Sequence, residues 1–376
     1  MALSIEETAL AAAMIAGPVT QESVLDALRQ IIDPDLHRDI VSLGMIKDLV
    51  IEPAASGSHV AFTFELTTPA CPVRNQFEAA ARSAVEAIPG VHSVDVKMSA
   101  NVQKSSAGAT GHQLDLPNVR NIIAVASGKG GVGKSTVAAN IAVALAESGA
   151  KVGLLDADVY GPSVPQLMGV YDGIKAEDGK MVPNQSYGVK LISLGFIAGD
   201  KPIMWRGPMI GHALKQLLED VNWGDLDYLV IDLPPGTGDA QISLAQLLPM
   251  SGVVIVSTPQ DLALGIAQKA LLMFKQLHVP VLGIVENMST YCCPNCGHEV
   301  DIFGAGGPEA AATEMKVPFL GRVPLALAIR ESGDNGIPVP ISEPESPAAE
   351  AFSAIARKTA AQVSIRNQRA IPLVVR

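Results

Sequence analysis

The feature that most constrains the fold is a glycine-rich segment, GKGGVGKST at residues 128–136, which stands between two regular apolar patterns. The residues before it, NIIAVAS, are typical of a buried strand, and VAANIAVALAESG after it is typical of a helix. The segment fits the pattern G-x-x-x-x-G-K-[ST], in which loop N–H groups surround phosphate oxygens and the helix adds its positive N-terminal end. We therefore expect a strand, a phosphate-binding loop and a helix in succession.

Individual positions of this loop have different expected roles in binding ATP. The glycines allow the backbone to curl around the phosphates. Lys134 is expected to reach the β- and γ-phosphates and to act in catalysis, and Ser135 is expected to offer its hydroxyl to Mg²⁺. The residues expected to bind ATP here are Gly128, Lys129, Gly130, Gly131, Val132, Gly133, Lys134, Ser135 and Thr136.

The rest of the chain divides into three zones. Residues 120–376 alternate short apolar runs with alanine-rich helical patterns, which predicts βαβ units around a mostly parallel sheet flanked by helices. Residues 20–100 predict a smaller α/β domain in front of it. Residues 101–119 lack periodicity and are rich in small and polar residues, so we expect a flexible linker there. The candidate strands after the loop's own are KVGLLDAD, VKLISLG, DYLVIDL, GVVIVST, VLGIVEN and FLGRVP.

Composition limits the location and the partners. The formal net charge of −11 argues against a broad nucleic-acid-binding surface. No apolar run reaches the roughly 18 residues that a membrane span requires. The N-terminal stretch MALSIEETALAAAMIAG has acidic rather than basic residues before its apolar run, which disfavours a signal peptide. With four cysteines, a disulfide scaffold is not expected. We expect a cytoplasmic protein that binds neither nucleic acid nor membrane.

Acidic residues follow two of the expected strands. Asp156 and Asp158 end the run GLLDAD, at the edge where parallel sheets bind ligands. The run DYLVIDL contains Asp232 near its end and continues through PPGTG to Asp239. An acidic residue after an apolar strand holds Mg²⁺ in phosphate-loop proteins. The prolines of this turn stiffen it, whereas Gly236 allows a bend.

Three of the four cysteines lie in TYCCPNCGHE, residues 290–299. Cys293 and Cys296 form a C-x-x-C pair, which supplies half of the four ligands that zinc and iron–sulfur clusters usually take. The pair is therefore either a redox disulfide or half of a larger site. A thioredoxin-like dithiol is disfavoured, because the pair does not open a helix after a strand. Cys71 precedes a predicted helix and is either a reactive accessory thiol with a lowered pKa or a buried structural cysteine.

The motifs resemble those of a known family. The second lysine of the loop, Lys129, makes it similar to the deviant phosphate loop of the nitrogenase iron protein, MinD, ParA and ArsA. The segments DADVYGPSVPQLMG, DLPPGTGD and ENMSTYCCPNCGHEVDIFGAGG narrow the resemblance to the Mrp/ApbC branch of iron–sulfur cluster carriers. The segments DPDLHRDIVSLGMIKD and TTPACPVRNQF resemble the small iron–sulfur-assembly domain that is often fused in front of such ATPases.

The resemblance implies an ATP-hydrolysing homodimer in which Lys129 reaches the nucleotide of the partner subunit. Asp158 would orient the attacking water, with Asp156 as the second candidate. Asn287, after VLGIVE, would bond the base, although an ordinary strand-end asparagine has the same spacing. The resemblance also implies a Mg²⁺ site at Ser135 and Asp232, and a switch II segment that includes Asp232, Gly236 and Asp239.

The same resemblance gives the cysteine pair a role. One C-x-x-C pair from each subunit, joined at a two-fold axis, provides four thiolates for a shared [4Fe–4S] cluster. Cys293 and Cys296 would be the ligands, with Cys292 outside the set. The protein would then receive the cluster from a donor and pass it to recipient apoproteins. The competing hypotheses are a shared zinc site in an ATP-gated adaptor, and a ParA/MinD-like spatial-organiser ATPase.

Overall fold

The computed structural model of the chain describes residues 18–54, 57–105, 114–158, 161–198, 207–293 and 295–369. The chain separates into two compact units, Met1–Val102 and Gln103–Arg376. Each unit has its own hydrophobic core. We describe the two in turn.

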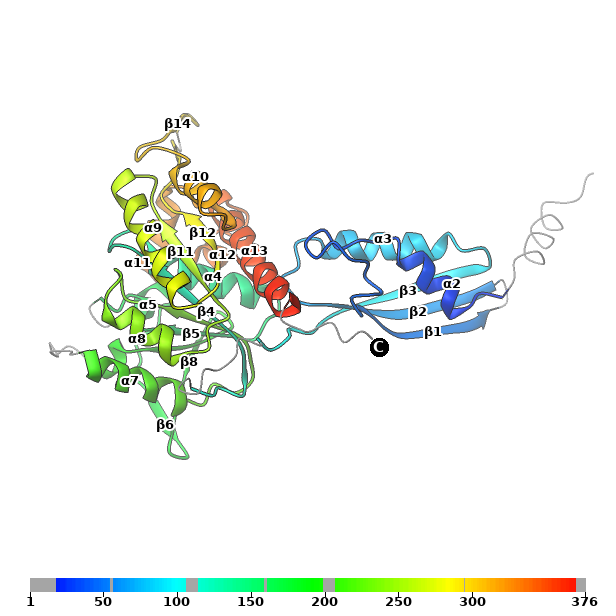
Figure 1. Cartoon of the computed structure of the whole chain (residues 1–376), viewed down its shortest axis with the longest axis horizontal. Helices are drawn as coiled ribbons and strands as arrows, with labels where there is room; N and C mark the ends of the chain where they lie inside the picture. Colours follow the sequence, from blue (N-terminus) through cyan, green and yellow to red (C-terminus); the bar gives the residue numbers. More distant parts are fainter. Residues whose placement is uncertain are drawn as a thin grey trace, which may run out of the picture. The chain divides into compact units, whose positions relative to one another are not determined.

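The first unit is a three-stranded sheet covered by two helices (Figure 1). Strand β2 (Gly57–Leu66) lies between β1 (Ile46–Ala54), which is antiparallel to it, and β3 (Val91–Ala100), which is parallel. Alternate residues of β2 are buried against the helices α2 (Gln21–Leu28) and α3 (Arg74–Glu86). Stacking of Phe64 on Phe77, with ring centroids 5.4 Å apart, joins the sheet to α3.

The second unit contains an eight-stranded sheet in the order β15-β12-β11-β4-β10-β5-β9-β8. The central β4 (Val119–Ser127) is buried at all but one of its positions, as expected of a strand covered on both faces. The short β8 (Asn184–Ser186) is antiparallel to β9, and the other neighbours in the sheet are parallel. The predicted mostly parallel sheet is thus confirmed. The remaining strands of the sheet are β5 (Val152–Asp156), β9 (Val189–Ser193), β10 (Leu226–Asp232), β11 (Gly252–Ser257), β12 (Val281–Glu286) and β15 (Phe319–Arg322).

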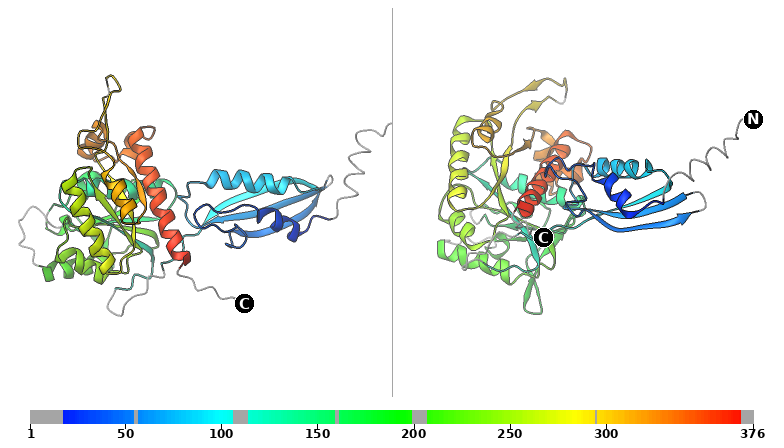
Figure 2. Two further views of the ribbon diagram at one scale, coloured as in Figure 1. Left: turned by 45° about the horizontal axis from the view of Figure 1, so that its top comes forward. Right: turned by 45° about the vertical axis from the view of Figure 1, so that its right-hand side comes forward.

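Helices cover both faces of this sheet (Figures 1 and 2). The main apolar core lies between the sheet and one layer, which comprises α7 (Gly207–Glu219), α8 (Asp239–Leu247), α9 (Asp261–Gln276) and α10 (Gly307–Glu314). On the other face, α4 (Lys134–Glu147) packs beside the long α13 (Pro347–Arg369). The shorter elements are α5 (Val164–Leu167), β6 (Lys175–Glu177), β7 (Lys180–Val182), α6 (Gly195–Ala198), β13 (Tyr291–Cys292), β14 (Glu299–Val300), α11 (Leu327–Asn335) and α12 (Val339–Ser342).

The segment between the units differs from the flexible linker expected over 101–119. The Asn101 amide donates to Leu66 O within the first unit, at 2.8 Å. The Gln103 carbonyl accepts hydrogen bonds within the second unit from the side chains of Asn121, at 3.0 Å, and Asn367, at 3.1 Å. Further along, Leu114 and Leu116 are buried in the core of the second unit. Much of the expected linker is therefore attached to a unit; residues 106–113 lie outside the described residues.

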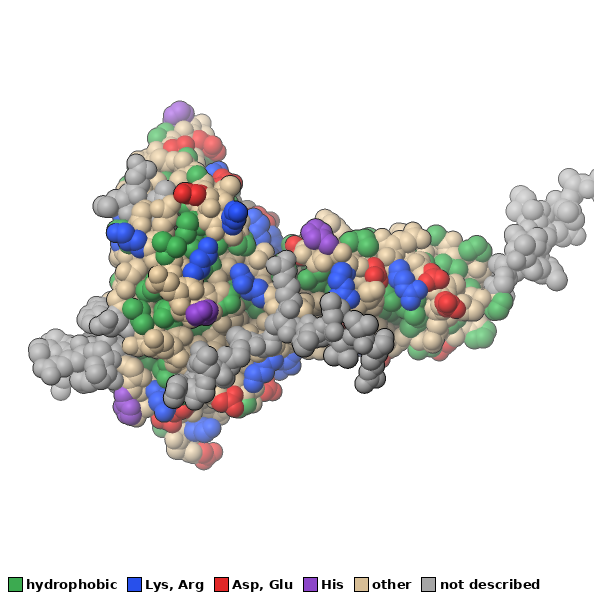
Figure 3. Space-filling model, viewed as in Figure 1, with side chains coloured by type: hydrophobic (Ala, Val, Ile, Leu, Met, Phe, Trp, Pro, Cys, Tyr) green, Lys and Arg blue, Asp and Glu red, His purple; other side chains and the backbone are tan. Residues whose placement is uncertain are grey.

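The surface of the described residues is mixed in charge. On the face seen in Figure 3, Lys and Arg side chains are interspersed with Asp and Glu side chains. In the described part of the chain, no helix is both long enough and apolar enough to span a bilayer.

Candidate functional site

The glycine-rich loop lies where β4 ends and α4 begins, at the carboxyl edge of the sheet. Gly131 and Gly133 adopt φ values of +78° and +79°, which favour glycine. Gly133 also has no space for a side chain, because a Cβ there would lie 2.1 Å from Nδ2 of Asn287. The loop therefore has the tight, left-handed turns that aim backbone N–H groups inward.

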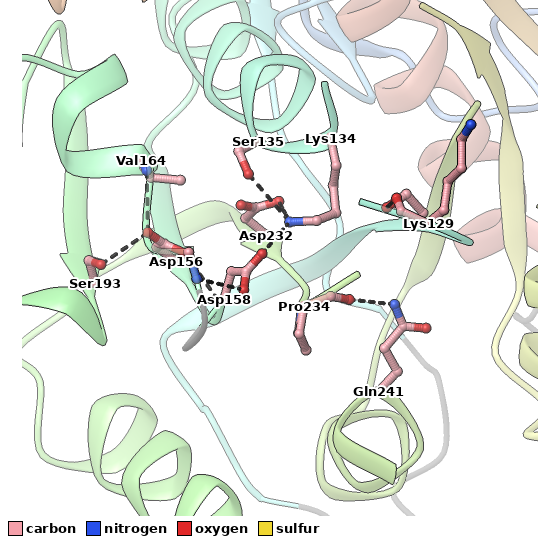
Figure 4. A network of polar contacts seen from close by, with 12 residues as sticks. Lys129, Lys134, Ser135, Asp156, Asp158, Val164, Ser193, Asp232, Pro234 and Gln241 are labelled. Atoms are coloured by element: carbon pink, nitrogen blue, oxygen red, sulfur yellow. Dashed lines mark hydrogen bonds and ion pairs between the residues drawn. The ribbon is translucent and has the colours of Figure 1, made fainter. Parts of the chain in front are cut away.

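A buried lysine and carboxylates lie directly under this loop (Figure 4). The Lys134 ammonium is 2.6 Å from Oδ1 of Asp232 and 3.6 Å from Oδ2 of Asp158. Both acids are brought here by neighbouring strands, since β5 and β10 pair in parallel and place Asp156 opposite Asp232. Lys134 is only 6% exposed, so its charge is balanced inside the protein. The structure thus gathers residues that the sequence predicted separately.

The predicted magnesium ligands also lie together. Oδ2 of Asp232 is buried and has no hydrogen-bond partner among the described residues. The hydroxyl of Ser135 lies beside the same carboxylate and accepts from the Lys134 ammonium at 3.3 Å. A hydroxyl and an unpartnered carboxylate oxygen at a phosphate loop are the hard oxygen donors that Mg²⁺ binds. The residues present therefore fit this cation.

The two aspartates after β5 have different surroundings. Asp156 is fully buried and accepts hydrogen bonds from Ser193 Oγ at 3.0 Å and from the amides of Asp158 and Val164. Burial, and then the nearby Asp232 carboxylate, raise the pKa of Asp156 to about 7. Asp158 faces Lys134, and its Oδ1 accepts from the Gly161 amide at 3.3 Å. Asp158 therefore lies beside the buried lysine, and Asp156 ties β5 to its neighbours.

The turn after Asp232 is fastened at two points. The Gly236 amide donates to the carbonyl of Ser127 at 3.0 Å, which joins the turn to the start of the phosphate loop. The Pro234 carbonyl accepts from Nε2 of Gln241 at 2.6 Å. Nothing in the sequence singled out Gln241, a glutamine within α8. The side chain of Asp239, which was also predicted to belong to this segment, lies outside what the structure describes.

Lys129 points away from the carboxylate cluster (Figure 4). Its ammonium donates to Oε1 of Gln260 at 3.2 Å, in the connection between β11 and α9. The structure thus separates the two lysines of the loop, with Lys134 buried under it and Lys129 directed outward.

A pocket of about 320 Å³ opens beside the loop. Gly133 and Thr136 line one side of it, and Asn287 and Met288 line another. The side-chain Nδ2 of Asn287 donates to the Val132 carbonyl at 2.8 Å, so this residue also holds the loop. The remaining lining residues come from α5, from the segment after β15 and from α11: Ser163, Gln166, Leu167, Pro324, Leu325, Ala326, Ile329, Arg330, Gly333 and Asp334. The pocket has the size of a small-molecule site.

A short ladder leads from this pocket to the cysteines. Both the amide and the hydroxyl of Ser289 donate to the Val323 carbonyl, at 3.0 and 2.9 Å. The Leu325 amide donates to the Thr290 carbonyl at 3.1 Å, and Tyr291 then pairs with Leu325. One strand of the ladder continues from the pocket residue Asn287, and the other contains the pocket residue Leu325. The ladder ends where β13 begins.

The cysteines lie on a hairpin formed by β13 and β14 that projects from its unit (Figures 1 and 2). Cys292 and Cys296 are exposed, and Cys293 is half-buried. The amides of Asn295 and Cys296 and the Cys296 thiol bond the Cys293 sulfur, which lowers the pKa of Cys293. The turn therefore brings the predicted pair together and favours a thiolate; Pro294 within it lies outside the described residues.

The hairpin does not hold a complete metal site by itself. Among the described residues, no group of three or more His, Cys, Asp and Glu side chains is arranged to hold a metal ion. Cys292 instead directs its Sγ to the Gly297 carbonyl, at 3.7 Å. The base of the hairpin is closed by Thr290, whose hydroxyl donates to Oδ1 of Asp301 at 2.7 Å.

Cys71 behaves differently from the pair. It is half-buried against the core of the first unit. Burial raises the pKa of Cys71, and the nearby carboxylates of Asp33 and Asp35 raise it further. Of the two alternatives for Cys71, a reactive thiol with a lowered pKa and a buried structural cysteine, these surroundings agree with the second. The sequence shows the helix but not the depth of the sulfur.

Comparison with protein families gives two matches that together cover most of the chain. Residues 118–360 match the family described as NUBPL iron-transfer P-loop NTPase. Residues 21–97 match the family described as iron-sulfur cluster assembly protein. Both matches agree with the resemblance drawn from the motifs.

Individual proteins resemble the chain over long stretches. The iron-sulfur cluster carrier protein of Synechocystis is 47% identical over 360 residues, which are 92% of this chain and 99% of that protein. The iron-sulfur cluster transfer protein NUBPL of Dictyostelium discoideum is 47% identical and covers 69% of this chain and 84% of its own length. Among solved structures, the nucleotide-binding protein of Archaeoglobus fulgidus in complex with ADP is 39% identical, with a TM-score of 0.56, over 66% of this chain and 98% of its own.

Proposed function

Because the chain belongs to the family of NUBPL iron-transfer P-loop NTPases, we propose that it binds and hydrolyses ATP and carries an iron–sulfur cluster to recipient apoproteins. The observation that carries this proposal is a phosphate-loop site joined to a C-x-x-C hairpin by the ladder at Ser289 and Thr290. The name of the Synechocystis relative, an iron-sulfur cluster carrier protein, supports the cargo. The Archaeoglobus neighbour, a nucleotide-binding protein with ADP, supports the nucleotide.

ATP binding would engage the loop and its lysine. The loop amides cradle the phosphates, and Lys134 exchanges its contact with Asp232 for phosphate oxygens. Ser135 and Asp232 would hold Mg²⁺, which when bound neutralises charge on the phosphate oxygens. The pocket beside the loop would receive the nucleoside, with Asn287 at its inner wall.

Hydrolysis requires a group that orients water and a charge that stabilises the transition state. Asp158 lies beside Lys134 and supplies a carboxylate for the water. Lys129, which is directed outward, is free of the carboxylate cluster and suits a contact across a subunit interface to the partner's nucleotide. The catalytic groups we propose are therefore Lys129, Lys134 and Asp158.

The cluster is the cargo of this protein. Cys293 and Cys296 provide two thiolates per chain, and a [4Fe–4S] cluster takes four. A homodimer with its hairpins at a two-fold axis meets that number, because such an interface presents the same residues twice. The exposure of the hairpin supports this arrangement. We also assign the protein to the cytoplasm, where thiols stay reduced.

Nucleotide and cargo would be coupled through the ladder. After Asn287, Ser289 bonds Val323 and Thr290 bonds Leu325, on either side of Pro324. Pro324 and Leu325 line the pocket, and the hairpin follows Thr290 directly. A nucleoside that shifts either pocket wall moves the base of the hairpin with it. ATP would thus alter the exposure of the cluster and its transfer.

Anaerobic reconstitution with iron and sulfide tests the cargo. The wild-type protein should show the broad visible absorbance of an iron–sulfur cluster, with matching iron and acid-labile sulfide. The Cys293→Ala/Cys296→Ala protein should lose both, whereas the neighbouring Cys292→Ala change, as a matched control, should leave them. Full loading of the double variant, or zinc in place of iron after anaerobic purification, would overturn the proposed cargo.

A further inference from the structure

A buried glutamine in α8 has no role in the function proposed above. Gln241 is 1% exposed and lies in the first turn of the helix that follows the Asp232 turn. Its Nε2 donates to the Pro234 carbonyl at 2.6 Å. Its Oε1 is buried and has no partner among the described residues. A buried acceptor without a partner lowers stability, so packing alone would favour an apolar side chain here.

The backbone that Gln241 holds is the one that follows the magnesium ligand. Pro234 is two residues after Asp232, and its ring fixes the direction of the chain at that point. On either side, the Leu233 amide bonds the Val125 carbonyl and the Gly236 amide bonds the Ser127 carbonyl, both at 3.0 Å. These two bonds connect the turn to β4 and the loop, and Gln241 connects it to α8.

The side chain is placed to hold one position of the turn and to accept a bond in another. Figure 4 shows its amide nitrogen directed at Pro234 and its oxygen directed away from that residue. The turn contains Gly236, with φ at +101°, and Gly238, both of which permit local rearrangement. The Gln241 oxygen is therefore available as an acceptor for a backbone N–H of a rearranged turn.

We propose that Gln241 is a positioning residue for ATP hydrolysis. It holds the Pro234 carbonyl and thereby sets where Asp232 and the following turn stand relative to the terminal phosphate. It touches neither the nucleotide nor the reacting water. The inference rests on the proposed ATPase function and adds a residue that no motif of the sequence contains.

A positioning role and a packing role predict different kcat values for Gln241→Met. The first predicts a lowered kcat, and the second predicts a kcat like that of the wild type. Methionine keeps the length and most of the volume, and it removes both the donor and the unpartnered acceptor. If Gln241 positions the turn, kcat should fall about tenfold, as for the loss of one hydrogen bond in the transition state, with KM within about twofold. The melting temperature should stay the same or rise, because the unpartnered acceptor is gone.

The matched control is Gln246→Met, an exposed glutamine on the same helix, which should change neither kcat nor stability. The variant Gln241→Glu adds a second readout. An ionised carboxylate cannot donate to the Pro234 carbonyl, whereas a protonated one can. The ratio of its kcat to that of the wild type should therefore increase as the pH falls.

The outcomes separate this inference from the function on which it rests. Wild-type kcat in Gln241→Met, or a loss of kcat matched by a lowered melting temperature and no pH-dependent recovery in Gln241→Glu, would overturn the positioning role alone. A wild-type protein that binds no ATP and hydrolyses none would overturn the proposed function. The assay is steady-state phosphate release by the full chain, with thermal unfolding measured on the same preparations.

Discussion

In the second unit, the phosphate-loop site and the cysteine hairpin present their functional groups to very different surroundings. Lys134 and Asp232 are 6% and 0% exposed and contact each other inside the fold. Cys292 and Cys296 are exposed on a hairpin with two-residue strands. The first site is assembled by several segments of one chain, among them the phosphate loop and the ends of β5 and β10. As proposed, the second presents two ligands, Cys293 and Cys296, where a cluster needs four. The difference supports the proposal that a second copy of the chain completes the cargo site, whereas one chain builds the phosphate loop and its buried carboxylates.

The largest expected effect is a loss of ATP hydrolysis on replacing Lys134, with no loss of cluster binding at the cysteine hairpin. Lys134→Ala should lower ATP hydrolysis about 1000-fold, because it removes the charge that binds the phosphates and stabilises the transition state. Cluster content after reconstitution without nucleotide should stay near that of the wild type. Phosphate release and iron content, measured on one preparation, check the pair of expectations. Loss of iron together with activity would mean that the two regions are one cooperative site.

The next effect distinguishes the two aspartates after β5. Asp158→Asn should lower kcat about 100-fold with little change in KM, because it removes the carboxylate proposed to orient water. Asp156→Asn serves as the comparison and should affect hydrolysis less, since Asp156 bonds Ser193 and the backbone. Steady-state kinetics of both variants decide the assignment. A larger loss of kcat in Asp156→Asn than in Asp158→Asn would contradict this assignment and make Asp156 the residue that orients the water.

A smaller effect tests the connection between the regions. ATP should change the alkylation rate of Cys293 and Cys296 in cluster-free protein by about threefold, a shift of under 1 kcal/mol. Inorganic tripolyphosphate, which can occupy the loop but lacks the nucleoside, should change it less. Thr290→Val, which opens the base of the hairpin, should weaken the ATP effect. The control Thr313→Val removes a hydroxyl from α10 outside the ladder and should leave it intact. An equal change of the alkylation rate with ATP and with tripolyphosphate would rule out coupling through the ladder.

A further effect, on stability rather than on activity, concerns pH and the buried Asp156. Its pKa rises from the ordinary 3.8 to about 7 in the folded protein, so the folded state binds more protons than the unfolded state between these values. The stability that this group contributes is present in full below pH 3.8 and is lost as the pH rises through about 7. Asp156→Asn should flatten this decline. Urea unfolding of the wild type and of Asp156→Asn at pH 5 and pH 8 measures this loss of stability. An equal loss in the two proteins would contradict the assignment of the raised pKa to Asp156.

The sequence predicted the regions that have strong local patterns. Six of the seven parallel strands are buried at nearly all of their positions, so each appears as a largely continuous apolar run. The edge strand β15 is buried only at Leu320. The phosphate loop is recognisable because its glycines and lysine have a fixed spacing. The hairpin of β6 and β7 was not foreseen, since three exposed or half-exposed residues per strand carry no periodicity.

The remaining features depend on contacts between distant segments. Asn287 holds the loop through Val132, which is 155 residues away in the chain. Asn367 holds Gln103 across 264 residues, which is why a polar stretch that lacks periodicity is attached to the second unit. Gln241 stands out through an unpartnered oxygen, and only the packed structure shows that. Likewise, the burial that raises the pKa of Cys71 is invisible in its local sequence.

The central claim is that the cysteine hairpin is half of a site and that a second copy of the chain completes it. The most direct test measures iron and acid-labile sulfide per chain in anaerobically reconstituted protein, together with the mass of the assembly. The account predicts a dimer with about two iron atoms per chain, that is, one [4Fe–4S] cluster for two chains. A monomer with about four iron atoms per chain would contradict it.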